Sequence, residues 1–203
     1  MSQNTSTAVM QRRVEPHDSL DDFPTPPWAT RALLEWIGPQ SGRVCREPTA
    51  NRGHMVRPLR EHFGKVEASD IFDYGAGFDT NDYLFGPMPN PVAWTIFNPP
   101  FRLAEQFIDR ACYSSMHGVA AIVRSAFLEG VGRYNRLFSE NPPSHVLQFS
   151  ERVVMHKGKL TAKGSTATAY CWLVWQTSHE GSTQFDWIAP CRKRLERLED
   201  YAE

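Results

Sequence analysis

Four consecutive residues near the middle of the chain, Asn98, Pro99, Pro100 and Phe101, combine groups suited to chemistry on a planar nitrogen. The Asn98 side chain and the carbonyls of Asn98 and Pro99 are hydrogen-bond acceptors. Two acceptors that bind the two hydrogens of an exocyclic amino group would make its nitrogen more nucleophilic in the transition state. Phe101 offers a ring on which a nucleobase can stack, a contact worth roughly 1–3 kcal/mol per base. The tetrapeptide alone is equally compatible with a turn that caps a helix.

The segments that flank the tetrapeptide predict a strand followed by a helix. Residues 92–97 form an apolar run, and residues 102–116 carry apolar residues at helical spacing. Proline has no amide hydrogen to donate, so Pro99 and Pro100 must end the strand. The acceptors therefore lie at the carboxyl end of a strand, where α/β sheets bind ligands.

The Asn98–Phe101 tetrapeptide resembles the Asp/Asn/Ser-Pro-Pro-Tyr/Phe motif of S-adenosylmethionine-dependent amino-methyltransferases, in particular the DNA adenine-N6 methyltransferases. The similarity covers most of residues 20–177. It implies an α/β, Rossmann-like class I methyltransferase fold, with a doubly wound, mostly parallel sheet and a reversed last strand. It makes the whole tetrapeptide, Pro100 included, the catalytic motif. Asn98 and the Pro99 carbonyl would orient the target amine, and Phe101 would stack the base.

A strand–turn–helix unit nearer the N-terminus resembles the cofactor-binding motif of the same superfamily. Residues 43–48 predict a strand, 49–53 a turn and 54–63 a helix. The family motif runs acidic-x-x-x-Gly-x-Gly, and its small residues let the backbone approach the cofactor. Glu47 and Gly53 match, whereas Asn51 replaces the first glycine. Asn tolerates left-handed backbone angles better than other non-glycine residues, so we expect the turn to form.

Two further segments are assigned to the cofactor. Thr25 and Pro26 precede a helix predicted over 29–37, and the resemblance places them at the methionine end of S-adenosylmethionine. Asp70 ends a strand predicted over 65–70, where Rossmann-like folds place a carboxylate that accepts hydrogen bonds from the ribose hydroxyls. An aspartate that simply ends a strand is the alternative.

The long loop predicted over 71–92 contains the last cofactor candidates. Its Asn-Asp-Tyr-Leu stretch at 81–84 resembles the segment whose acid meets the adenine amino group of the cofactor. The resemblance gives that contact to Asp82 and makes Tyr83 a wall for the ring. Loops of this length inside a compact domain are often functional.

The remaining chain predicts more alternating strands and helices, which is typical of a doubly wound sheet. We expect strands or strand-like stretches at 118–124, 145–149, 152–155 and 167–175, and helices at 127–138 and 192–201.

A local excess of positive charge follows the predicted catalytic strand. Between residues 124 and 163 there are seven basic and three acidic residues, a local charge of +4 in a chain whose net charge is −1. Phosphate contacts by basic side chains dominate nucleic-acid affinity. The candidates are Arg133, Arg136, Lys157, Lys159 and Lys163. An ordinary solvated loop explains the lysines equally well.

Length and composition limit the number of domains and the class of protein that the chain can form. The chain has 203 residues and is 41% hydrophobic, which fits one domain. We expect a disordered or loosely attached tail at 1–18 and a single methyltransferase domain at 19–203, without a separate target-recognition domain. The four cysteines and seven histidines are scattered, so no metal site is predicted. No apolar run suits a membrane span and no signal segment is evident, which favours a cytoplasmic protein.

The sequence therefore predicts an enzyme that transfers a methyl group from S-adenosylmethionine to adenine N6 in DNA, with short or relaxed sequence specificity. RNA adenine, cytosine N4 and protein glutamine remain alternative substrates, because the tetrapeptide does not separate them. A non-catalytic nucleic-acid-binding homologue also remains, since Asn51 departs from the cofactor motif. No feature of the sequence indicates an oligomeric state.

Overall fold

The structure is a computed structural model that describes residues 21–202. The tail predicted for residues 1–18 lies outside them. Within the described residues, no helix is long and apolar enough to cross a membrane, and no group of three or more His, Cys, Asp or Glu side chains could hold a metal ion.

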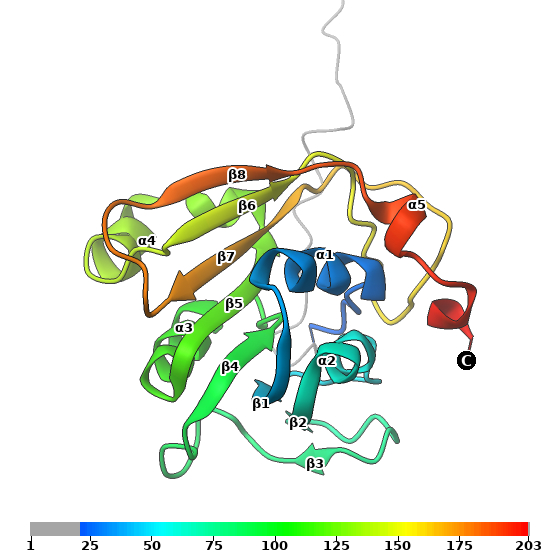
Figure 1. Cartoon of the computed structure of the whole chain (residues 1–203), viewed down its shortest axis with the longest axis horizontal. Coiled ribbons are helices and arrows are strands. Elements are labelled where there is room, and N and C mark those ends of the chain that lie inside the picture. Colours follow the sequence, from blue (N-terminus) through cyan, green and yellow to red (C-terminus); the bar gives the residue numbers. More distant parts are fainter. Residues whose placement is uncertain (1–20, 203) are drawn as a thin grey trace, which may run out of the picture.

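A single sheet organises the described residues, with strand order β3-β2-β1-β4-β5-β7-β6-β8 (Figure 1). β7 runs antiparallel to both of its neighbours, β5 and β6, and the other pairings are parallel. The strands are β1 (Gln40–Glu47), β2 (Phe63–Asp70), β3 (Asp79–Thr80), β4 (Val92–Phe97), β5 (Ser115–Arg124), β6 (His145–Phe149), β7 (Tyr170–Gln176) and β8 (Gln184–Ile188).

Helices cover both faces of the sheet, which confirms the doubly wound arrangement. They are α1 (Pro27–Ile37), α2 (Val56–His62), α3 (Ala104–Tyr113), α4 (Val131–Arg133) and α5 (Arg192–Leu195), together with the short 3-10 or π-helical turns η2 (Ser125–Leu128), η3 (Tyr134–Phe138) and η4 (Leu198–Tyr201). Alternate residues of β5 show the two layers. Ala120 and Ile122 join the core that contains α1 and α2, whereas Val119 and Ala121 join the core that contains α3.

Two predicted elements differ from the structure. The strand predicted over 152–155 is wrong: Val153, Val154 and Met155 are buried but irregular. Both edges of β6 are already paired, with β7 and β8, so this stretch finds no free edge there. The helix predicted over 127–138 is broken at Gly130, whose φ of +115° is outside the helical range.

The end of the sheet also extends beyond the prediction. The reversed strand is present as β7, but β8 follows it along the chain and pairs with β6. The alternation of polar and apolar residues over 184–188 was a usable signal for this strand. The predicted helix at 192–201 forms only as α5 and η4.

Candidate active site

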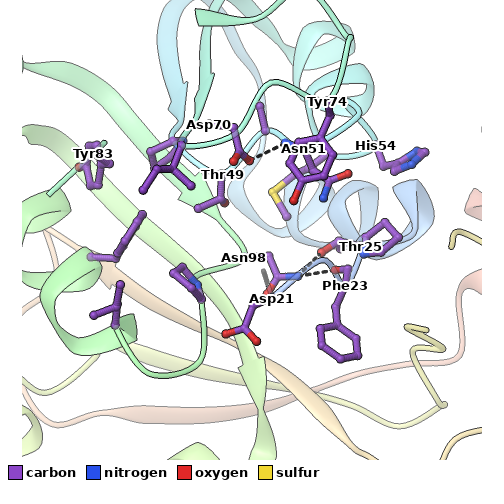
Figure 2. Close-up of a pocket in the computed structure, with 18 of the residues that line it drawn as sticks. Asp21, Phe23, Thr25, Thr49, Asn51, His54, Asp70, Tyr74, Tyr83 and Asn98 are labelled. Carbon is purple, nitrogen blue, oxygen red and sulfur yellow. Dashed lines mark hydrogen bonds between the residues drawn. The ribbon is translucent and has the colours of Figure 1, made fainter. Parts of the chain in front are cut away.

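A cavity of about 560 Å³ opens at the carboxyl ends of β1, β2 and β4 (Figure 2). These strands are parallel neighbours, so the segments that follow them meet at one edge of the sheet. The volume lies in the range of ordinary small-ligand sites. Seven of the predicted cofactor and catalytic residues line it: Thr25, Asn51, Asp70, Asp82, Tyr83, Asn98 and Pro100. The turn that carries Gly53 contributes Ala50 to the lining.

The turn after β1 accommodates Asn51 in the left-handed conformation that the sequence predicted, with φ of 49°. Its side chain lies along the turn, because Nδ2 donates to Asp22 Oδ1 at 2.7 Å and Oδ1 accepts the Arg52 amide at 2.7 Å. The Asn51 amide in turn donates to Asp70 Oδ2 at 2.9 Å. Asn51 therefore substitutes for glycine in the backbone geometry of the turn while binding its own neighbours.

Gly53 meets a true steric requirement of the same turn. Its φ is +84°, and a Cβ atom at this position would lie 2.9 Å from the Phe78 ring. A side chain would thus have to displace an aromatic residue as well as adopt a strained backbone.

Glu47 lies beneath this turn rather than on the cavity wall. Its carboxylate is buried and accepts hydrogen bonds from the Thr49 amide at 3.0 Å and the Thr49 hydroxyl at 2.7 Å. Burial raises its pKa to about 8, although the Thr49 hydrogen bonds oppose the shift. Its second oxygen, Oε2, has no partner among residues 21–202. Glu47 therefore supports the turn from inside the core.

Asp70 faces the cavity from the end of β2 with both oxygens partly used. Oδ2 accepts the Asn51 amide and Oδ1 accepts the Phe72 amide at 3.1 Å. Burial raises the pKa of this carboxyl. Each oxygen has further lone pairs, so the group can still accept hydrogen bonds from a pair of hydroxyls.

Asp82 and Tyr83 form the opposite side of the cavity. Asp82 is exposed and lines the cavity, and its Oδ1 accepts the Leu84 amide at 2.9 Å. Tyr83 is buried, and its ring packs against Phe107 with centroids 5.2 Å apart. The two residues together offer an acceptor beside an apolar wall.

Asn98 is held in one orientation by two oxygen acceptors, as Figure 2 shows. Its Nδ2 donates to the Phe23 carbonyl at 2.9 Å and to Thr25 Oγ1 at 3.1 Å. A carbonyl oxygen accepts but cannot donate, so it requires the amide nitrogen on its side. The Oδ1 atom, for which residues 21–202 provide no hydrogen-bond donor, is therefore the free acceptor.

The rest of the tetrapeptide is more enclosed than the sequence predicts. Pro100 lines the cavity, but Pro99 is buried. Phe101 packs beside Phe23, with ring centroids 5.3 Å apart, and the Arg124 guanidinium lies 3.9 Å from its centroid. A cation at this distance covers one ring face. Base stacking by Phe101 stays a prediction.

Several cavity residues were not among the sequence candidates. Asp21 accepts the Phe101 amide through Oδ2 at 2.7 Å. His54 is largely buried, and burial lowers its pKa to about 4, so the ring is neutral at pH 7. Their positions in the chain, next to predicted site residues, were the one signal that could have identified them. Asp21 closely precedes the Thr25-Pro26 pair, and His54 follows Gly53. Pro26 itself is the N-cap of α1 and is not part of the lining.

The five basic candidates do not form one surface. Arg133 and Arg136 lie at α4 and η3, where Glu105 is 3.6 Å from the first and 2.8 Å from the second. Lys157, Lys159 and Lys163 lie on the exposed segment between β6 and β7, on the other side of the molecule in Figure 1. The structure therefore separates the lysines from the ion-paired arginines.

Comparisons with known proteins agree on the fold. No protein-family model and no curated protein match the sequence. Among solved structures, a modification subunit of a putative type I restriction enzyme from Vibrio vulnificus has a TM-score of 0.61 at 16% identity, covering 90% of this chain and 50% of that one. A putative RNA methyltransferase from Pyrococcus horikoshii has a TM-score of 0.60 at 18% identity, covering 80% and 90%.

A third structure contains a bound ligand. Magnesium protoporphyrin IX methyltransferase from Synechocystis, solved with bound S-adenosylmethionine (SAM), has a TM-score of 0.51 at 13% identity, covering 74% of this chain and 79% of that one. The chain spans only half the length of the restriction-enzyme subunit that it matches. At these identities the likeness concerns the fold, and the protein has the Rossmann-like fold of class I methyltransferases.

Proposed function

We propose that this protein transfers a methyl group from S-adenosylmethionine to the N6 amino group of adenine in DNA. The observation that carries the proposal is the orientation of Asn98. Its nitrogen is committed to Phe23 and Thr25, so Oδ1 remains as an acceptor at the end of β4 beside the cavity. An acceptor held in advance is what a planar amino group needs to become a nucleophile.

The residues present fit the proposed cofactor. Asp70 can accept hydrogen bonds from the two ribose hydroxyls, and Asp82 can accept one from the adenine amino group, with Tyr83 as the wall. Thr25, whose hydroxyl accepts from Asn98, and Asn51, in the turn after β1, line the cavity and would face the methionine portion. Glu47, Gly53 and Pro26 would act by shaping these segments. When bound, the cofactor would supply an electrophilic methyl group.

The choice of DNA rests on two kinds of support. The tetrapeptide resembles that of DNA adenine-N6 methyltransferases, and one similar structure is a modification subunit of a putative restriction enzyme. A duplex target would have to be flipped out of the stack, at a cost of a few kcal/mol.

RNA is the substrate that competes most directly. A putative RNA methyltransferase is similar over 80% of this chain, and the Asn98 geometry suits any planar amine. Cytosine N4, protein glutamine and a non-catalytic nucleic-acid-binding role are the remaining alternatives. The same experiment separates all of them.

The test is transfer of labelled methyl from S-adenosylmethionine to unmethylated DNA, RNA and protein, followed by digestion to nucleosides or amino acids. Label in N6-methyldeoxyadenosine is the expected result, and it should be absent when Asn98→Ala replaces the wild type. Label confined to RNA, to N4-methylcytosine or to protein would contradict the proposed substrate. Absence of both label and cofactor binding would favour the non-catalytic role.

A further inference from the structure

An acidic side chain from a distant part of the chain lies at the tetrapeptide. Asp21 lines the same cavity as Asn98, and its Oδ2 accepts the Phe101 amide at 2.7 Å. The segment is held further because the Phe23 amide donates to the Asp21 carbonyl at 3.0 Å and the Phe23 carbonyl accepts from Asn98. The carboxylate is thus tied to Phe101 directly, and its segment is tied to Asn98 through Phe23. Figure 2 shows Asp21, Phe23 and Asn98 beside one another.

The proposed reaction needs a proton acceptor that the tetrapeptide lacks. An amino nitrogen that gains a methyl group carries a positive charge and one hydrogen more than the neutral product. Asn98 is a neutral amide whose nitrogen is already committed, and its oxygen is a poor base. A carboxylate within the same cavity can take that proton.

The electrostatic setting of Asp21 suits this task. Among residues 21–202, no Lys or Arg side chain lies within salt-bridge distance of its carboxylate. Its sequence neighbour Asp22 differs, because its Oδ2 lies 3.0 Å from Arg52 and its Oδ1 binds Asn51. An aspartate already paired with a cation gives up that pairing when it accepts a proton, whereas the Asp21 carboxylate has the Phe101 amide as its hydrogen-bond donor among residues 21–202.

We infer that Asp21 is the proton acceptor for the methylated amine, an inference that rests on the proposed function. In this step an Asp21 oxygen forms an O–H bond while the N–H bond breaks. The electron pair of that bond stays on nitrogen, which becomes neutral, and the carboxylate becomes a carboxylic acid. The proton leaves to water when the product departs. Asn98 orients the amine and Asp21 removes its surplus proton.

Asp21→Asn is the informative variant, since its side-chain oxygen can still accept the Phe101 amide hydrogen. We expect unchanged melting temperature and unchanged S-adenosylmethionine affinity, with a single-turnover methylation rate on the order of 100-fold lower. Asp186→Asn, which removes a carboxylate from the exposed edge strand β8, is the matched control and should behave as wild type. Asp21→Ala also removes the hydrogen bond to the Phe101 amide and should therefore lower the melting temperature as well.

A binding measurement tests the same idea without turnover. Sinefungin carries an ammonium group where S-adenosylmethionine carries its reactive methyl, whereas S-adenosylhomocysteine carries nothing there. A carboxylate at the methyl-transfer position should favour the ammonium. Loss of a charged hydrogen bond of roughly 1.5 kcal/mol corresponds to about a 10-fold loss of affinity. In Asp21→Asn, the dissociation constant of sinefungin, measured by calorimetry, should therefore rise by about 10-fold relative to that of S-adenosylhomocysteine.

The outcomes separate the two proposals. Wild-type rate and an unchanged sinefungin ratio in Asp21→Asn would overturn the role of Asp21 while leaving the proposed function intact. Equally weaker binding of S-adenosylmethionine, sinefungin and S-adenosylhomocysteine would also overturn it, since Asp21 would then bind the methionine portion that the three ligands share. If the wild type binds none of these ligands and labels no substrate, the proposed function fails, and the role of Asp21 fails with it.

Discussion

Asn98 shows why the identity of one side chain matters at this site. Its nitrogen faces two acceptors, the Phe23 carbonyl and Thr25 Oγ1, and its oxygen remains for a ligand. An aspartate here would turn an acceptor toward the Phe23 carbonyl. The amide therefore acts as a donor toward the protein and as an acceptor toward the cavity.

Replacing Asn98 should separate binding from chemistry. Asn98→Ala removes the proposed amine acceptor but none of the groups assigned to the cofactor, so methyl transfer should fall by at least about 100-fold. The dissociation constant for S-adenosylmethionine, measured by calorimetry, should change little. Asn90→Ala, an exposed site whose backbone carbonyl binds Arg46, is the control. Parallel loss of binding and transfer would contradict this division of roles.

Glu47 gives a pH-dependent prediction. Burial raises its pKa from 4.5 to about 8, so between these values only the folded protein holds the proton. The free energy of unfolding should therefore lose this contribution as the pH rises from about 4.5 to about 8. Glu47→Gln cannot titrate and keeps an oxygen for Thr49. Its stability relative to wild type should increase across that pH range.

Urea unfolding of both proteins at about pH 5 and about pH 9 measures the effect. Comparison with the variant isolates Glu47 from every other titrating group. A stability difference that stays constant with pH would mean that Glu47 is already ionised in the folded protein.

At the scale of elements, a buried arginine helps to fasten the C-terminal segment to the helical layer. Arg31 of α1 binds Asp200 of η4 at 2.7 Å and 2.8 Å, and it binds Glu61 of α2 at 2.9 Å and 3.0 Å. Asp200 is only 2% exposed. Three segments far apart in the sequence thus share one charge network.

Breaking that network should destabilise the fold without touching the cavity. Asp200→Ala leaves the buried Arg31 short of a partner, which costs about 3–5 kcal/mol of unfolding free energy. Thermal or urea unfolding measures the loss, and the neighbouring exposed residue supplies the control variant Glu199→Ala. Wild-type stability in Asp200→Ala would show that Glu61 alone compensates Arg31.

At the scale of the whole molecule, the question is where a nucleic-acid backbone would lie. Arg133 and Arg136 are occupied by Glu105, whereas Lys159 and Lys163 are exposed on the segment between β6 and β7. The backbone of this segment contacts residues next to the cavity, since the Gly158 amide donates to the carbonyl of Asp22, which follows the cavity residue Asp21. That hydrogen bond is 2.7 Å long. This segment is therefore the better placed of the two basic regions.

The double variant Lys159→Ala/Lys163→Ala should weaken duplex DNA binding about equally for all sequences. The slope of log affinity against log salt should fall by about 2, one for each lost phosphate contact. Fluorescence anisotropy over a salt series measures the slope, with Lys65→Ala/Lys193→Ala as the charge-matched control. An unchanged slope would exclude these two lysines as phosphate contacts.

Much of the framework of the site could be predicted because it depends on local stereochemistry. Two prolines end a strand wherever they occur, and the apolar run before them forms β4 with the predicted bounds, Val92–Phe97. Asn51 adopts the left-handed angle that its type tolerates. Asp70 ends β2, at the position where the predicted strand over 65–70 ends.

The sequence by itself thus determined the order of strands, turns and helices that carries the tetrapeptide, because these follow from periodicity and backbone sterics. Only the tertiary structure decided which distant side chains meet there. Asp21 caps Phe101 from 80 positions away, Arg124 covers the Phe101 ring, and Glu105 occupies two of the predicted nucleic-acid contacts. Such partnerships depend on how complete elements pack, since a local pattern does not encode which charged or aromatic groups the fold brings within a few ångströms.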